Sequence, residues 1–223
     1  MFPMSKKDMS PVDENEPGRR RRKETRPAEI AVAALQVFTE KGFAAARLED
    51  VAERAGTAKG TIYLYYPTKE ALFEAVVRDA FAPLLGQIGA ALAEHATDCE
   101  TLLRFVIRTM YRELIGTERR EIMRLLIAES VRFPQLVEFY HREAISRGRA
   151  LLGAVLARGV ASGEFRDCPA TRHPEVVMGP AVLAGVWKLV FEPVEPLDLE
   201  TYADAHLDLV LSAIRSEPTR RVR

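Results

Sequence analysis

The sequence predicts an all-α protein, and three observations support that prediction. The β-branched residues recur at helical spacings, and the turn pairs Asn-Gly and Asp-Gly, which mark β-hairpins, do not occur. Glycines and prolines gather in the short stretches GTE, RFP, SGEFRDCP and EPVEPLD, which separate the periodic segments as helix breaks do. The chain has 223 residues, 48% of them hydrophobic, so it can bury one or two cores.

A helix and a second, shorter one open the folded part of the chain. The first helix is expected to start with Thr25 as its N-cap, to carry Pro27 in its first turn and to end at Lys41-Gly42. Gly56 is expected to stop the second helix, whose apolar face comprises Leu48, Val51, Ala52 and Ala55.

Longer helices follow. One is expected to start with Thr68 as its N-cap, and Pro83 is expected to kink or divide it. The others are expected at about residues 99–115, 118–131, 134–161, 174–191 and 199–214.

Charge and cysteine content narrow the classes of partner. Basic and acidic residues each number 32, so the net charge is zero and a polyanion must be recognised by a local patch. Cys99 and Cys168 lack the spacing of metal ligands, and so few cysteines indicate a reducing cytoplasm. A disulfide between the two is the alternative. We expect no metal and no cofactor. We also expect no membrane contact, because no apolar run reaches about 18 residues and the first 24 residues lack a signal-peptide segment.

The spacing of Ala52, Gly56 and Ile62 is that of a helix-turn-helix. Ala52 is small where two helices touch, Gly56 can adopt positive φ at the turn, and Ile62 anchors the second helix. Any αα-hairpin can match this triple, so the spacing alone leaves DNA binding open.

The helix after the turn carries few apolar residues. If Ile62 and Tyr66 face inward, the outer surface comprises Lys59, Gly60, Thr61, Tyr63, Leu64 and Tyr65. Such a surface suits DNA, because lysine and tyrosine reach phosphates, glycine allows close approach and threonine can touch a base edge. The alternative is a polar surface helix whose tyrosines cover the edge of a core.

From Thr25 to about Phe73 the chain resembles the TetR family of bacterial transcription regulators. That family's DNA-binding domain ends in a pattern close to AGVSKGTLYHYFPSKEAL, and this chain has AGTAKGTIYLYYPTKEAL. The preceding stretch, ALQVFTEKGFAAARLEDVA, is similar to the family's first two helices. The resemblance implies a three-helix DNA-binding domain at 25–70 and a larger ligand-binding and dimerisation domain at 71–214. We place flexible ends at 1–24, a basic arm, and at 215–223.

The resemblance also implies which residues face the DNA: Arg47, Thr57, Lys59, Gly60, Thr61, Tyr63, Leu64, Tyr65 and Lys69. Three departures from the family pattern bear on this set. Ala46-Arg47 replaces a serine or threonine, which removes a hydroxyl and adds a cation. Thr57-Ala58 replaces Val-Ser, so we expect the N-cap hydroxyl at Thr57. Leu64 replaces a frequent histidine or tyrosine, which puts the operator preference in doubt.

The run Arg19-Arg-Arg-Arg-Lys23 has two interpretations. Residues 19–26 hold six cations and one acid, so the segment could lie along phosphates or in the minor groove. It could equally be a solvated tail.

An apolar cavity is expected in the C-terminal part, since the resemblance implies a small-molecule site there. The candidate lining comprises Phe105, Thr109, Met110, Leu126, Glu129, Phe133, Tyr140 and Trp187. Each polar member could instead be a core group bonded to a neighbouring helix. Small residues at 179–185 and an apolar stripe at 202–213 suit a dimer face or a monomeric core.

We therefore expect a homodimeric transcription regulator, a repressor, that binds a palindromic operator in double-stranded DNA and is released by a small, largely apolar effector. Residues 123–166 are similar to the AcrR-like branch, which implies control of efflux genes. The alternative is a helical carrier of small molecules or lipids that does not bind DNA. No enzyme is expected, because GxSxG, HExxH, Walker and dinucleotide glycine motifs do not occur.

Overall fold

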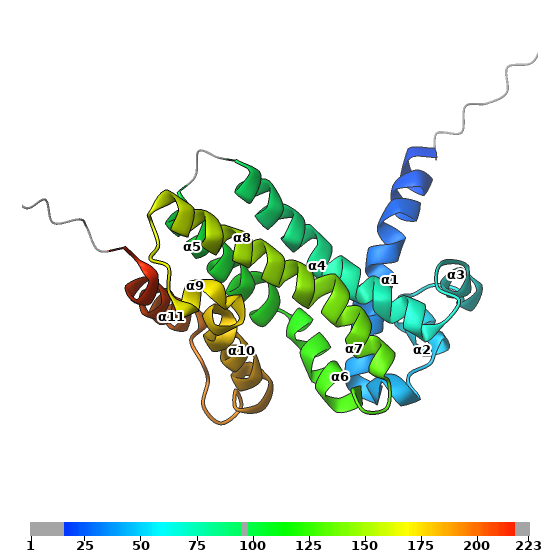
Figure 1. Cartoon of the computed structure of the whole chain (residues 1–223). Helices are drawn as coiled ribbons and strands as arrows, with labels where there is room; N and C mark the ends of the chain where they lie inside the picture. Colours follow the sequence, from blue (N-terminus) through cyan, green and yellow to red (C-terminus); the bar gives the residue numbers. More distant parts are fainter. Residues whose placement is uncertain (1–15, 95–97, 217–223) are drawn as a thin grey trace, which may run out of the picture.

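The computed structural model describes residues 16–94 and 98–216, and this part of the chain is helical (Figure 1). The prediction of an all-α protein is confirmed, since the described residues contain a single isolated bridge, between Phe165 and Arg215, and no named strand. The helices are α1 Glu16–Ala45, α2 Leu48–Arg54, α3 Lys59–Tyr65, α4 Lys69–Ala93, α5 Cys99–Met110, α6 Glu121–Glu129, α7 Pro134–Tyr140, α8 Ser146–Ser162, α9 Pro169–Arg172, α10 Pro174–Val190 and α11 Leu199–Ile214. Two π-helical turns, η1 Tyr111–Ile115 and η3 His141–Ile145, and a 3-10 turn, η2 Glu118–Arg120, complete the set.

Helix α1 begins earlier than the sequence predicted. The expected N-cap at Thr25 is wrong, because the helix already starts at Glu16, where Pro17 occupies the first turn that tolerates proline. The expected break is present at Gly42, whose φ of 74° is non-helical. The side chains of the basic run 19–23 lie outside the described residues, so their contact with DNA stays a prediction.

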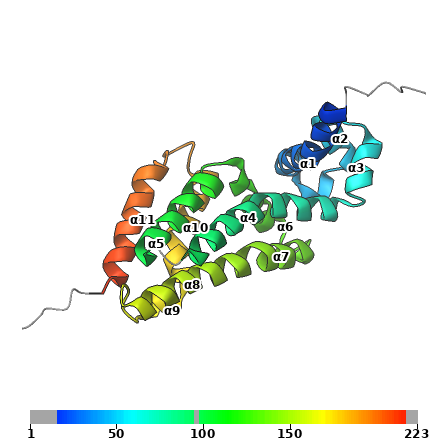
Figure 2. The same cartoon turned by 90° about the horizontal axis from the view of Figure 1, so that it is seen from above.

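The helix-turn-helix forms as predicted. Gly56 takes a φ of 59° after α2, and Ile62 of α3 is fully buried. These helices share a hydrophobic core with α1, in which Phe38, Phe43 and Phe73 are also fully buried. Helices α1–α3 therefore form one compact unit at one end of the molecule (Figure 2).

Helix α4 connects this unit to the rest of the protein. It runs unbroken through Pro83, so the expectation that proline would divide it is wrong; the ring is exposed, which leaves the freed carbonyl to water. By length and mean hydropathy alone α4 is long and apolar enough to cross a membrane. Nine of its residues are buried against other helices, as in the core helix of a soluble protein.

The larger domain is a helical bundle with a second hydrophobic core. The five predicted helical stretches are confirmed, with the π-helical turns continuing α5 and joining α7 to α8. The short α9 was not predicted. Helices α10 and α11 lie at the end of the molecule opposite α1–α3 (Figures 1 and 2). Cys99 and Cys168 are free thiols, so the disulfide alternative does not hold.

Candidate functional site

Helix α3 presents its polar and apolar side chains to solvent. Lys59 and Gly60 are exposed, Thr61 is half-buried, and Leu64 is 79% exposed. Tyr63 is 43% exposed and Ile62 faces the core. A seven-residue helix with one buried side chain is therefore held by Ile62, and its remaining face is open.

Lys59 and Tyr63 share one partner on α2. The Lys59 ammonium forms an ion pair with Glu49, and the Tyr63 hydroxyl donates to Glu49 Oε1 at 3.2 Å. The ammonium also lies 5.6 Å from the centroid of the Tyr63 ring. The hydrogen bond from Lys59 lowers the pKa of Glu49, so this carboxylate is ionised at neutral pH.

The starts of α2 and α3 differ from expectation. The N-cap of α3 is Ala58, which has no capping side chain, so the prediction of a Thr57 hydroxyl cap is wrong. The Thr57 N–H instead donates to Ala52 O at 2.9 Å in the turn. Arg47 is the N-cap of α2; its backbone N–H donates to Asp50 Oδ2 at 3.1 Å, and its exposed guanidinium forms no ion pair in the described part of the chain.

Tyr65 and Lys69 are positioned differently from the predicted DNA contacts. Tyr65 is half-buried and packs against the first core, so it is not on the outer surface. The Lys69 ammonium donates to Phe43 O at 2.7 Å, Ala44 O at 2.9 Å and Ala46 O at 3.5 Å. An ammonium has three protons, and these three carbonyls, left free by the break at Gly42, accept all of them. Contact of Tyr65 and Lys69 with DNA stays a prediction that these positions do not support.

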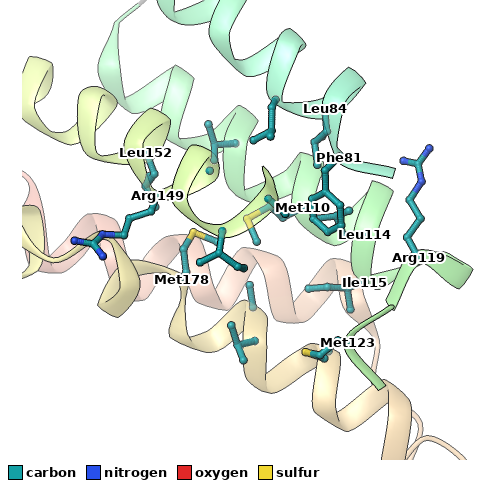
Figure 3. Close-up of a pocket in the computed structure, with 18 of the residues that line it drawn as sticks. Phe81, Leu84, Met110, Leu114, Ile115, Arg119, Met123, Arg149, Leu152 and Met178 are labelled. Carbon is teal, nitrogen blue, oxygen red and sulfur yellow. The ribbon is translucent and has the colours of Figure 1, made fainter. Parts of the chain in front are cut away.

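An apolar cavity of about 310 Å³, partly open to solvent, lies within the larger domain (Figure 3). Its walls come from α4, α5, η1, η2, α6, α7, η3, α8 and α10. The apolar lining includes Phe81, Leu84, Leu85, Ile88, Val106, Met110, Leu114, Ile115, Met123, Tyr140, Leu152, Met178 and Val182. This volume and lining are typical of a small-molecule site.

Charged groups lie at the edges of the cavity. Figure 3 shows Arg119 and Arg149 on opposite sides, each with its guanidinium pointing away from the centre. Arg149 Nε lies 3.8 Å from Glu175 Oε2, and Arg119 Nη1 lies 3.7 Å from Glu113 Oε2. Inside, burial raises the pKa of Tyr140 to about 12, so its hydroxyl is a neutral donor that makes no hydrogen bond in the described residues.

Two of the eight predicted ligand residues line the cavity: Met110 and Tyr140. The other six do not line it, since helical periodicity identifies a buried face without telling which neighbour covers it. Phe105 packs against the second core, Thr109 is buried beside it, and Leu126 belongs to the first core. The Trp187 ring packs against Phe191 in a tilted arrangement, and its indole N–H donates to Glu195 O at 2.8 Å.

Glu129 and Phe133 lie instead where the two domains meet. Glu129 Oε1 accepts from the Ala44 N–H at 3.3 Å, and the Phe133 ring meets Phe43 edge-on with centroids 5.0 Å apart. Both α4 and α6 line the cavity and pack against α1. Sequence reasoning missed the α4 and α10 walls; a signal was available in three methionines, Met110, Met123 and Met178, which all line the cavity.

An exposed apolar stripe runs along α10. Val176, Leu183 and Val190 are each more than half exposed, and Leu209 of the neighbouring α11 is 62% exposed. The small residues predicted for a dimer face mostly point elsewhere, because Ala181, Ala184 and Gly185 are buried within the subunit. Within residues 16–94 and 98–216, no group of three or more potential metal ligands occurs.

The architecture defines a class: a helix-turn-helix protein whose larger helical domain encloses a ligand-sized cavity. The profile described as "Bacterial regulatory proteins, tetR family" matches residues 30–76, and that of the "Tetracyclin repressor-like, C-terminal domain" matches residues 94–210. The chain therefore belongs to the TetR family of transcription regulators.

The chain matches relatives over most of their length. The chain is 25% identical over 201 residues to the transcriptional repressor KstR2 of Rhodococcus jostii, covering 87% of this chain and 93% of that one. It is 26% identical over 198 residues to the fatty acid metabolism regulator protein of Bacillus subtilis, covering 87% and 100%. The crystal structure of Bacillus subtilis FadR in complex with stearoyl-CoA has the same fold, with a TM-score of 0.68, 21% identity and coverage of 84% and 99%.

Proposed function

We propose that this protein is a dimeric repressor that binds a palindromic operator through α3 and releases it when an acyl-type effector fills the cavity. One observation carries the proposal: α4 and α6 both line the cavity and both pack against α1, the helix that supports α2 and α3. A ligand that favours one arrangement of α4 and α6 therefore also biases the position of α3.

The α3 surface supports the DNA half of this function. The proposed contacts are Arg47, Thr57, Lys59, Gly60, Thr61, Tyr63 and Leu64, of which Arg47 and Lys59 supply the cations for phosphates. One seven-residue helix reads too few base pairs for a unique site. Two copies related by a two-fold axis read successive major grooves about 34 Å apart.

The exposed stripe Val176, Leu183, Val190 and Leu209 is our proposed dimer face. Contiguous exposed apolar side chains of this kind mark association surfaces. A dimer through α10 and α11 leaves both copies of α3 free, because α1–α3 lie at the opposite end of the subunit (Figure 2).

The cavity supports an effector with a long apolar part and an anionic end. Its inner walls are aliphatic, aromatic and thioether groups, while Arg119, Arg120 and Arg149 lie at its edges. Fatty acids and their thioesters have this distribution. The names of two relatives point the same way, one regulating fatty acid metabolism and one solved with stearoyl-CoA. Efflux control stays a prediction, and a cytoplasmic location follows from binding the chromosome.

Gel retardation of the DNA upstream of the protein's own gene tests the first half. Wild-type protein should retard this DNA in a salt-dependent manner, and the double variant Lys59→Ala, Tyr63→Ala should not. Arg172→Ala, which removes an exposed cation of α9, should behave like wild type. A helical carrier that does not bind DNA would give no retarded band at all.

The second half is tested with stearoyl-CoA, octanoyl-CoA and the free acids as probes. At least one should abolish the retarded band. Gly148→Leu fills the cavity and should keep the band while removing the response, whereas Gly86→Leu, at an exposed glycine with open space beside it, should respond normally. Equal responses of the two variants would contradict an effector site in this cavity.

A further inference from the structure

We propose that Glu49 determines the DNA specificity of α3 by holding its phosphate-binding side chains until they meet the operator. The proposal rests on the DNA binding argued above and assigns a role to a residue of α2 outside the recognition helix. It begins from one carboxylate oxygen, Glu49 Oε1, that is the partner of both the Lys59 ammonium and the Tyr63 hydroxyl.

Glu49, Lys59 and Tyr63 contact one another on the surface that α3 presents for DNA. Glu49 is 41% exposed and Lys59 is 62% exposed, so both are within reach of a polyanion. Arg47, the N-cap of the same helix, forms no side-chain ion pair in the described residues, and Asp50 is close enough to interact with its charge. Lys59 is the cation of α3 whose charge Glu49 neutralises.

Neutralising Lys59 lowers the affinity for DNA of any sequence. Binding to arbitrary duplexes comes almost entirely from cations that replace counterions at phosphates. While Glu49 holds Lys59, the ammonium contributes nothing to this term, and the carboxylate itself repels phosphate. Non-specific binding is therefore weakened more than specific binding, which also has contacts to base edges.

The pair is nevertheless weak enough to open at the correct site. An ion pair between exposed side chains contributes little, because water and salt screen both charges. A phosphate placed by the operator contacts of Gly60, Thr61 and Leu64 can therefore take Lys59 and Tyr63 from Glu49 at little cost. At other sequences no such contacts fix the register. Replacing Glu49 by a phosphate as the partner of Lys59 and Tyr63 then adds little binding free energy.

The test measures Glu49→Gln and wild type on two probes, a duplex of random sequence and the retarded upstream fragment, between 50 and 200 mM salt. For Glu49→Gln the non-specific dissociation constant should fall about threefold to tenfold at 50 mM salt. The slope of log K against log salt should steepen by about 0.9 per subunit. Affinity for the upstream fragment should change less, so the specificity ratio should fall.

Glu53→Gln is the matched control, because it removes the same charge from the same helix at an exposed glutamate whose side chain forms no ion pair or hydrogen bond in the described residues. An equal effect of the two variants would show a general charge effect and overturn the proposal. Unchanged non-specific binding of Glu49→Gln, with operator binding about fivefold or more weaker, would instead identify Glu49 as a base-reading residue and also overturn it.

The outcome is separable from that of the proposed function. If wild-type protein retards neither probe, DNA binding itself is wrong. If wild type retards the upstream fragment and Glu49→Gln matches it on both probes, only the role of Glu49 is wrong. Equal melting temperatures of the variants would show that the exposed substitution leaves the fold intact.

Discussion

Glu129 of α6 accepts a hydrogen bond from the backbone N–H of Ala44 at 3.3 Å, across 85 positions in sequence. This contact joins α6, which contributes Met123 to the cavity, to the last turn of α1. Ala44 follows the break at Gly42, so its N–H has no regular helical partner there. The carboxylate therefore fixes the position of the helix-turn-helix relative to α6.

We expect Glu129→Ala to weaken the coupling between effector and DNA. Glu129 lines neither the cavity nor the α3 surface, so both binding reactions should persist. Allosteric coupling typically changes affinity by about 5-fold to 150-fold, and the variant should retain less than about threefold. Gel retardation with and without the active acyl probe measures this factor.

The control for this prediction is Glu138→Ala, which alters an exposed glutamate of α7 whose side chain makes no hydrogen bond in the described residues. It should keep the wild-type factor. A full response of Glu129→Ala would show that coupling passes through α4 alone.

Lys69→Met should destabilise the protein, in contrast to a DNA-contacting lysine. The substitution leaves three partly buried carbonyls, those of Phe43, Ala44 and Ala46, without their donor. A lost partner of this kind costs about 1–3 kcal/mol of the free energy of unfolding. Urea denaturation without DNA measures the loss.

Lys41→Met is the corresponding control, because Lys41 pairs with Asp50 on the surface at 2.9 Å with 47% of its side chain exposed. It should change the free energy of unfolding by less than about 1 kcal/mol. Equal stabilities of the two variants would return Lys69 to the list of possible phosphate contacts.

His206 should make the protein less stable in mild acid. Its ring is buried between α10 and α11; Nδ1 lies 3.0 Å from the Tyr111 hydroxyl and Nε2 lies 2.8 Å from Val177 O. Burial lowers the pKa of His206 below its ordinary value of 6.5. The unfolded chain then binds more protons than the folded one, so this contribution is complete above pH 6.5 and declines as the pH falls below it.

Urea denaturation between pH 5 and 8 tests this dependence. His206→Gln should be less stable at pH 8 and should flatten the decline below pH 6.5, whereas His141→Gln, at an exposed position, should keep the wild-type profile. An unchanged profile in His206→Gln would assign the pH dependence to other groups.

The helix-turn-helix and most helix positions could be predicted from the sequence, because their signals are local. Gly56 is needed for positive φ, Ile62 is the one apolar anchor of α3, and Asp198 before Leu199 caps α11 with its side chain on Glu200 N. The start of α1 was misplaced, since helix ends depend on weak propensities that extend beyond a single capping residue.

The cavity could not be predicted residue by residue. Periodicity identified the apolar faces holding Phe105, Leu126 and Phe133, but Phe105 and Leu126 pack in the two cores and Phe133 fills the contact between domains. Nor could the charge pattern show that the Lys69 ammonium donates to backbone carbonyls of its own chain, while the Arg47 side chain stays exposed.

The sequence by itself determined the helical class, the turn at Gly56 and the exposed character of Lys59, Gly60 and Leu64, because each follows from residues within one or two helical turns. Only the tertiary structure decided which faces enclose the cavity, that Glu49 holds Lys59 and Tyr63, and that Glu129 contacts Ala44. Side chains on different helices meet only once the helices have packed, and their packing depends on the shape of the whole core.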